Sequence, residues 1–222
     1  MNKREKRERL AAIVERLKEI YPDSVCALEY GGDPWRLLVM GRLSAQCTDA
    51  RVNIVCRELF EMFPTAEAMA NGDIAEIERI VKPCGLYRMK AQNIKDASVM
   101  LLRDYGGQLP DSIDELLKFP GVGRKIANLL VGDVFGKPAI VCDTHCIRIC
   151  GRLGMNPEKV NSPEKIERIL RELIDPAEGS EFCHRIVNFG RDICTARSPA
   201  CEGCPLADLC EKRIKELAAW KK

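Results

Sequence analysis

Long apolar runs are missing from this sequence, and none approaches the roughly 20 residues that a membrane-spanning helix needs. The amino-terminal residues also lack the pattern of a secretory signal peptide. An excess of charge of one sign is missing as well. The 35 lysines and arginines face 33 aspartates and glutamates, and the net charge of +2 neither indicates nor excludes a nucleic-acid partner. We therefore expect a cytoplasmic protein that has no membrane partner.

Alternating apolar and polar residues, the pattern of half-buried strands, are almost absent. Apolar residues instead recur at helical spacing along most of the chain, so the sequence predicts an all-α protein. Two helix starts resemble capping boxes, Asp73 with Glu76 and Ser112 with Glu115, and the second opens a short helix. Apart from the short helix after Ser112, the predicted helices cover residues 2–20, 35–44, 49–63, 73–81, 87–105, 123–135, 144–153, 163–173 and 178–189.

Residues 116–127 read Leu-Leu-Lys-Phe-Pro-Gly-Val-Gly-Arg-Lys-Ile-Ala, which indicates a short helix, a tight hairpin and a second helix. The glycines at 121 and 123 allow a sharp turn and leave backbone N–H groups unshielded by side chains. Such groups at the positive end of a helix bind phosphate readily. Lys125 falls in the first turn of the second helix, where the helix dipole disfavours an ammonium. With some desolvation, we expect the dipole to favour the neutral, nucleophilic amine.

Asp143 is predicted to return to the neighbourhood of Lys125. The second helix of the hairpin has about 13 residues and a length of roughly 20 Å. Residues 136–142 then span at most ~23–25 Å when extended, which is just enough to run back along the helix. The carboxylate of Asp143 would start the next helix beside the amine. Taken alone, Asp143 is more simply an N-cap and Lys125 a solvated lysine.

Four of the twelve cysteines crowd near the carboxyl end with the spacing C-x6-C-x2-C-x5-C. In a reducing compartment such a set indicates a metal site rather than disulfides. Zinc and an iron–sulfur cluster both accept four thiolates, so the spacing alone leaves the two open. The other eight cysteines are scattered through apolar stretches and are expected to be small buried side chains. The four candidate ligands are Cys194, Cys201, Cys204 and Cys210.

Residues 119–127 and the later Val-Cys-Asp-Thr-His at 141–145 resemble the helix–hairpin–helix signature of the endonuclease III family of DNA glycosylases. The cysteine spacing resembles the 4Fe–4S loop of the same family, so the resemblance implies one such cluster. It also implies a two-lobed fold. A six-helix domain over residues 26–137 would carry the hairpin, and a helical domain from residues 1–25 and 138–222 would carry the cluster. Lys125 and Asp143 would then face each other across a cleft.

The resemblance also assigns roles to residues outside the hairpin. Gln46, in the segment Leu-Ser-Ala-Gln, would fill the space of an extruded nucleotide, and Leu86 would wedge between bases. Simpler interpretations are a polar residue at a helix end for Gln46 and a buried loop leucine for Leu86. His145 would contact phosphate or orient the site, or else satisfy a helix amino terminus. The remaining residues expected to bind DNA are Gly121, Val122, Gly123 and Arg124.

The implied function is that of a bifunctional DNA glycosylase and AP lyase of base excision repair that removes oxidised pyrimidines. Lys125 and Asp143 would be catalytic, and the enzyme would need no nucleotide cofactor or catalytic metal. The partner would be duplex DNA with a damaged base or an abasic site, bound by a nucleoid-associated monomer. Two alternatives stay open: a thymine- or uracil-mismatch glycosylase, and a non-catalytic DNA-binding module. Leu117 departs from the glutamate of related sequences, which leaves the lesion range open.

Overall fold

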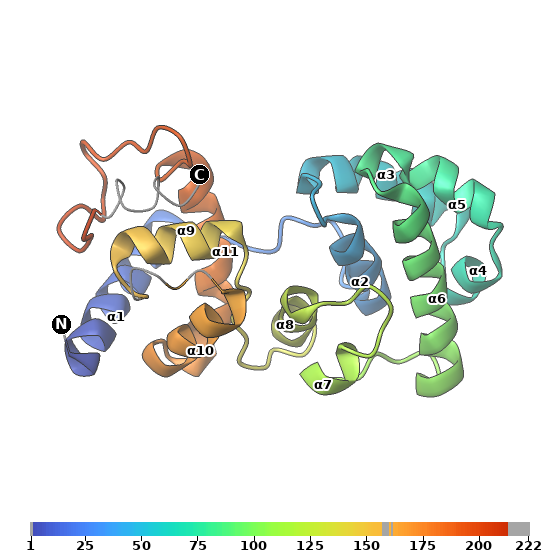
Figure 1. Ribbon diagram of the computed structural model, residues 1–222, viewed down its shortest axis with the longest axis horizontal. Coiled ribbons are helices and arrows are strands. Elements are labelled where there is room, and N and C mark those ends of the chain that lie inside the picture. Colours follow the sequence, from blue (N-terminus) through green and yellow to red (C-terminus); the bar gives the residue numbers. More distant parts are fainter. Residues whose placement is uncertain (1, 157–159, 161, 213–222) are drawn as a thin grey trace. The chain divides into compact units, whose positions relative to one another are not determined.

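The structure of the protein is a computed structural model that describes residues 2–156, 160 and 162–212. Within these residues it consists of helices and connecting loops, which confirms the all-α prediction. The chain divides into two compact units (Figure 1). The central unit is Cys26–Gly136, and the terminal unit takes in the described residues of Met1–Val25 and Lys137–Lys222. The assignment of separate roles to two such domains stays a prediction.

The central unit is organised around its longest helix, α6, which packs against α4 and α5 (Figure 1). Helix α2 is almost wholly buried and packs against both α6 and α8, so it ties the hairpin region to the rest of the unit. The elements are α2 (Pro34–Leu43), α3 (Asp49–Met62), α4 (Ala66–Asn71), α5 (Ile74–Val81), the 3₁₀ turn η1 (Lys82–Cys84), α6 (Tyr87–Tyr105), α7 (Ile113–Leu116) and α8 (Arg124–Asp133).

Most predicted boundaries hold to within two residues, because side chains of the predicted type stand at the helix starts. Thr48 caps α3 by accepting from the N–H of Arg51, and Asp73 caps α5 by accepting from that of Ala75. The short helix α4, which Thr65 caps, was not predicted. The capping box at Ser112 was wrong: its side chain makes no cap hydrogen bond.

Glu115, the other half of that predicted box, is engaged elsewhere. Its carboxylate accepts a hydrogen bond from Lys118 at 2.6 Å and another from the Tyr105 hydroxyl at 2.8 Å. A carboxylate held by two side-chain donors is not free to reach back to a helix start. A side-chain competition of this kind cannot be seen in a four-residue motif.

The terminal unit contains α1 (Lys3–Ile20), α9 (Thr144–Leu153), α10 (Pro163–Leu173), the 3₁₀ turn η2 (Pro176–Glu178) and α11 (Gly179–Asp192). Helix α1 packs against α10 and α11, so the helix that precedes the central unit and helices that follow it form one unit. The buried face of α1 is an apolar stripe at helical spacing, made by Leu10, Ile13, Val14 and Leu17.

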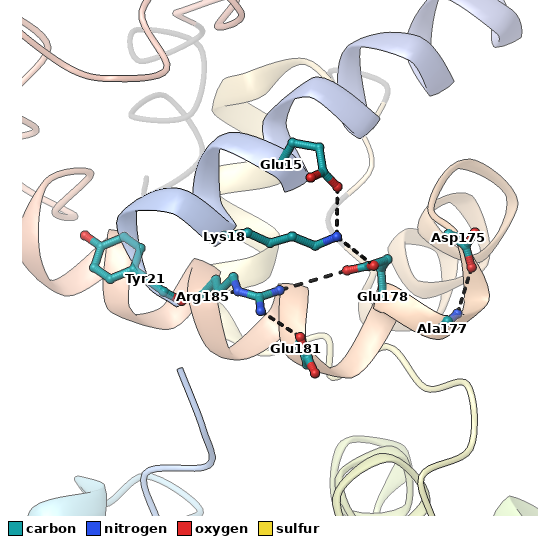
Figure 2. Close-up of polar contacts among 8 residues, drawn as sticks. All are labelled: Glu15, Lys18, Tyr21, Asp175, Ala177, Glu178, Glu181 and Arg185. Atoms are coloured by element: carbon teal, nitrogen blue, oxygen red, sulfur yellow. Dashed lines mark hydrogen bonds and ion pairs between the residues drawn. The ribbon is translucent and has the colours of Figure 1, made fainter. Parts of the chain in front are cut away.

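An ion pair connects the last turn of α1 to η2, and a hydrogen bond connects the end of α1 to α11 (Figure 2). The Lys18 ammonium donates to Glu15 at 2.8 Å and to Glu178 at 2.7 Å, and these carboxylates raise the pKa of Lys18. The Arg185 guanidinium donates to the carbonyl of Tyr21, the C-cap residue of α1. Contacts of this kind connect segments more than 150 positions apart in the chain. Among the described residues, no helix is long and apolar enough to cross a membrane.

Candidate DNA-repair site

The hairpin between α7 and α8 is held in place by its own apolar side chains. Phe119 is 2% exposed and stacks on Tyr105 with ring centroids 5.1 Å apart. Val122 is also buried, and its N–H donates to the carbonyl of Phe119 at 3.0 Å, which closes the turn. Gly121 and Gly123 are exposed, so the surface that the hairpin presents is largely backbone. The side chain of Val122 therefore belongs to the core of the hairpin and is not part of its exposed surface.

The backbone of Gly121 is packed so closely that only glycine fits. Its φ of +74° lies in the left-handed region that side chains disfavour. A Cβ atom at this position would overlap the guanidinium of Arg42 and the side-chain oxygen of Asn93. Gly123 differs, because its φ is −95° and a Cβ there would meet no atom within 4 Å. The turn thus needs glycine at position 121 for its fold, whereas position 123 keeps the backbone accessible.

Lys125 lies in the first turn of α8, as predicted, with an exposed side chain. The N-cap of this helix is Gly123, which has no side chain to satisfy the first N–H groups. Arg124 is exposed beside it. Lys125 belongs to the central unit and Asp143 to the terminal unit, so their approach to each other stays a prediction.

Gln46 and Leu86 are both exposed and both hold a strained backbone. Among the described residues, only these two and Lys212 combine a side chain with a positive φ, 56° for Gln46 and 47° for Leu86. Leu86 is the N-cap of α6 and is 57% exposed, so the interpretation as a buried loop leucine was wrong. A non-glycine residue in this region is uncommon and clusters at functional sites.

Two side chains that support these loops were missed in the sequence, Lys90 and Arg42. Lys90 is fully buried and donates to three backbone carbonyls. Arg42 is 8% exposed, and its Nε donates to the Asn93 side chain at 2.9 Å. Burial lowers the pKa of both cations from their ordinary values. The sequence contained a sign that Lys90 is buried, because it lies four residues before Ile94 and so on the same, buried face of α6.

Asp143 is the N-cap of α9, as predicted. Its Oδ1 accepts from the N–H of Cys146 at 2.8 Å, and its Oδ2 lies 3.3 Å from Nδ1 of His145. The histidine ring packs against α11, where a Cβ on Gly190 would touch it. Arg148, one turn further along α9, donates to the carbonyls of Gly190 and Cys194. The carboxylate therefore has one oxygen fixed by the helix and the other beside an imidazole.

The four cysteines of the carboxyl-terminal loop are half-buried. Desolvation raises the pKa of Cys204 and of Cys210, and the other thiols of the set raise them further. Among the described residues, no three His, Cys, Asp or Glu side chains converge closely enough to hold a single metal ion. Four cysteine thiols are the donor set that a 4Fe–4S cluster requires, so the chemistry of this loop suits that group.

Arg152 of α9 holds the start of this loop through hydrogen bonds to its backbone. It is 5% exposed, and its guanidinium donates to the carbonyl of Thr195 at 2.7 Å and to that of Ala196 at 2.9 Å. The same group lies 3.3 Å from Sγ of Cys194, and the Arg152 carbonyl lies 3.4 Å from Sγ of Cys210. Hydrogen bonds to cluster sulfurs are among the contacts that tune and stabilise iron–sulfur sites, so the donor set fits the predicted group.

Comparison with known proteins identifies the family. Residues 39–176 match the HhH-GPD superfamily of base excision DNA repair proteins. Residues 194–210 match the iron–sulfur binding domain of endonuclease III, a range that begins and ends on a cysteine of the set. The chain is 42% identical to endonuclease III of Synechocystis over 206 residues, which cover 92% of this chain and 93% of the relative. The chain belongs to the endonuclease III family.

Solved structures of the endonuclease III family agree with this assignment. A non-covalent endonuclease III–DNA complex superposes with a TM-score of 0.88 at 38% identity and covers 100% of both chains. A trapped endonuclease III–DNA covalent intermediate gives 0.88 at 39% identity, covering 98% of this chain and 99% of that one. The predicted family, the helix–hairpin–helix glycosylase fold and the 4Fe–4S cofactor are confirmed. The protein is a base excision DNA repair enzyme.

Proposed function

We propose that this enzyme is a bifunctional DNA N-glycosylase and AP lyase that removes oxidised pyrimidines from duplex DNA through a Schiff base on Lys125. The observation that carries the proposal is the exposed lysine in the first turn of α8, directly after a backbone hairpin. A relative of 39% identity is described as a trapped covalent intermediate with DNA, which supports a covalent route here as well.

Binding begins with the sugar–phosphate backbone. The exposed backbone of Gly121 and Gly123 and the amino end of α8 approach a phosphate, helped by the positive pole of the helix. Arg124 adds charge beside them, and His145 contacts a second phosphate or orients Asp143 at the amino end of α9. Such contacts position the duplex but carry no sequence information, as suits an enzyme that must find a lesion in any context.

The target nucleotide is then turned out of the stack, because its sugar is otherwise hidden inside the duplex. Leu86 enters between base pairs, and Gln46 occupies the space that the nucleotide leaves. Both side chains are exposed on short turns, which allows them to reach into a groove. A damaged base costs less to unstack than an intact pair, and this difference contributes to selectivity.

In the chemical steps, Nζ of Lys125 attacks C1′ of the extruded sugar while the bond from C1′ to the base breaks. Asp143 approaches the amine in the complex and stabilises the developing positive charge or carries the proton of the amine. Nζ then gives up a proton and the C1′–O4′ bond breaks as O4′ takes up a proton, which opens the sugar ring and forms the Schiff base. The Schiff base acidifies the proton on C2′. Its removal expels the 3′ phosphate, which cuts the strand on that side and leaves the sugar bound to Lys125 until hydrolysis.

The cluster has a mechanical role in this proposal. Cys194, Cys201, Cys204 and Cys210 hold the irons, and the bound cluster stiffens a loop that contacts DNA; no chemical step is assigned to it. The enzyme acts as a monomer on duplex DNA that carries a damaged base or an abasic site. We place it in the cytoplasm, in association with the nucleoid.

A panel of duplexes tests the substrate class. Each duplex carries one lesion in the same sequence: an oxidised thymine, an oxidised cytosine, a G·T mismatch, a G·U mismatch or an abasic site. We expect excision of the oxidised pyrimidines and nicking at the abasic site. Preferred excision from the mismatches would make the protein a mismatch glycosylase instead. Binding without nicking of any duplex would reduce it to a DNA-binding module.

A further inference from the structure

Lys90 is a buried cation whose hydrogen-bond partners are backbone oxygens. Its side chain is 0% exposed within the central unit, although lysine is almost never fully buried without compensation. The ammonium donates at 2.8 Å to the carbonyl of Leu43, at 2.8 Å to that of Ala45 and at 2.7 Å to that of Cys84. Three acceptors match the three donors of an ammonium, so its hydrogen-bonding capacity is filled.

These carbonyls belong to two separate segments of the chain. Leu43 ends α2, and Ala45 lies in the following turn, immediately before Gln46. Cys84 ends η1, two positions before Leu86. One nitrogen atom thus joins the turn that carries Gln46 to the turn that carries Leu86. The hydrogen bonds fix the spacing between two side chains that the proposed function sends into the same duplex.

The backbone at both turns needs such an anchor. Gln46 and Leu86 hold left-handed conformations that are unfavourable for side chains of their kind. A strained residue persists only where its surroundings over-determine its conformation. Lys90 donates a hydrogen bond to a carbonyl of each turn. The bonds lie beside each strained residue, at the carbonyl before Gln46 and at the second carbonyl before Leu86.

Asn93 extends this arrangement by one turn of α6. Its side-chain oxygen accepts from Arg42, and both side chains lie against Gly121 of the hairpin. Residues three apart on a helix share a face, so Lys90 and Asn93 act from one side of α6. This face of α6 therefore contacts the turn with Gln46, the turn with Leu86 and the hairpin with Gly121. The proposed function assigns a DNA contact to each of these segments of the central unit.

We propose that Lys90 is a positioning residue for nucleotide extrusion, which holds the Gln46 and Leu86 turns at the separation needed for both side chains to enter the duplex together. The proposal rests on the proposed function of these two residues. It goes beyond a role in stability. An apolar side chain of similar length in the same space can stabilise a fold as well as a buried charge does, but it gives neither turn a fixed donor.

The test uses the cluster-containing, full-length enzyme with Lys90→Met, which keeps the length of the side chain and removes its donors. Lys95→Met is the matched control, because Lys95 lies on the same helix and donates to the carbonyl of Gly72, away from both turns. Excision of a paired, oxidised pyrimidine is measured in single turnover, and extrusion is followed by the fluorescence of a 2-aminopurine beside the lesion. Thermal unfolding is recorded for each variant.

We expect Lys90→Met to slow excision of the paired lesion about tenfold or more and to weaken the 2-aminopurine signal. Nicking of a preformed abasic site, where no base must be unstacked, should fall by only about threefold. Lys95→Met should resemble wild type in both reactions. Equal losses on the two substrates, or no loss on either, would overturn the proposal. Failure of the wild-type enzyme to excise any lesion would instead refute the proposed function.

A double-mutant cycle separates positioning from stability. If Lys90 acts through Leu86, then Lys90→Met should cost little further activity once Leu86→Ala has removed the wedge, so the two losses do not add. Additive losses would mean that Lys90 supports the fold independently of the wedge, which contradicts the proposal. Should Lys90→Met fail to fold, Lys90→Gln, which retains two of the three N–H donors, enters the same cycle; we expect a smaller loss of excision that again does not add to that of Leu86→Ala, and additive losses would contradict the proposal.

Discussion

The Nε of Arg42 donates a hydrogen bond to the side-chain oxygen of Asn93 at 2.9 Å, and this pair occupies the space that any side chain on Gly121 would need. The contact joins three elements of the central unit: α2, α6 and the hairpin before α8. Buried polar groups that satisfy one another specify a single arrangement. The conformation of the hairpin at Gly121 thus depends on Arg42 and Asn93, which lie 79 and 28 positions earlier in the sequence.

The two hairpin glycines should respond differently to alanine. Gly121→Ala introduces a Cβ at positive φ that overlaps Arg42 and Asn93, so we expect a loss of about 2–4 kcal/mol in the free energy of unfolding. Gly123→Ala meets no atom within 4 Å and should change that free energy by less than about 1 kcal/mol. Urea unfolding of both variants measures the difference.

DNA affinity gives the complementary comparison. Gly123→Ala places a methyl group on exposed backbone where a phosphate is proposed to approach, so it should weaken binding to a duplex with an abasic-site analogue about tenfold. Unchanged affinity for the alanine variant would show that the phosphate is held elsewhere. Equal instability of the two variants would contradict the packing described for Gly121.

The variant Leu86→Gly should reduce the rate of excision without reducing the free energy of unfolding. Leu86 has a φ of 47°, and glycine adopts such angles without steric strain. Relief of this backbone strain stabilises the folded state, whereas the greater conformational freedom of glycine stabilises the unfolded chain. The two effects oppose each other, so Leu86→Gly should leave the free energy of unfolding unchanged or raise it by up to about 1 kcal/mol. Excision of a paired lesion should nevertheless fall about tenfold or more, because the wedge is lost.

The control for that variant is Met89→Gly, which removes another exposed apolar side chain, 51% exposed, from the same helix. Met89 has no assigned contact with DNA, and glycine inside a helix costs about 1 kcal/mol of stability. We expect the control to lose stability and keep its activity. If Leu86→Gly excised as fast as wild type, exposure and strain at position 86 would have no part in the reaction.

The cluster loop should depend on Arg152. Its guanidinium holds two loop carbonyls and lies against the Cys194 sulfur, so Arg152→Met removes these donors while keeping most of the side-chain volume. We expect the brown absorbance of the purified protein to fade about tenfold faster in the presence of an iron chelator. Arg197→Met is the control, since Arg197 is exposed on the same loop. Equal rates of fading for both variants would show that Arg152 does not protect the cluster.

Much of the site could be predicted because its signals are local. Two glycines around one apolar residue predict a hairpin, an aspartate before an apolar stripe predicts an N-cap, and four closely spaced cysteines predict a metal site. The N-cap role of Asp143 needs only the residues that follow it in the chain. The family resemblance then supplied roles for side chains such as Gln46, whose function no local rule determines.

The supporting residues could not be predicted in the same way, because their partners are distant in sequence. The helical register of Lys90 places it on the buried face of α6, but its partners at Leu43 and Ala45 are known only once α6 has packed. Arg42 likewise has no sequence-local partner that explains its burial. The failed capping box at Ser112 has the same origin, since Tyr105 and Lys118 engage the acid that the motif required.

The central claim is that the amine of Lys125 becomes covalently bound to DNA. Borohydride reduction during the reaction with a lesion-bearing duplex should trap a stable enzyme–DNA adduct, and digestion with mass spectrometry should place the sugar remnant on Lys125. Lys125→Gln should yield no adduct, whereas Asp143→Asn should form the same adduct more slowly. An adduct of undiminished yield with Lys125→Gln, or a remnant mapped to another amine, would contradict the account.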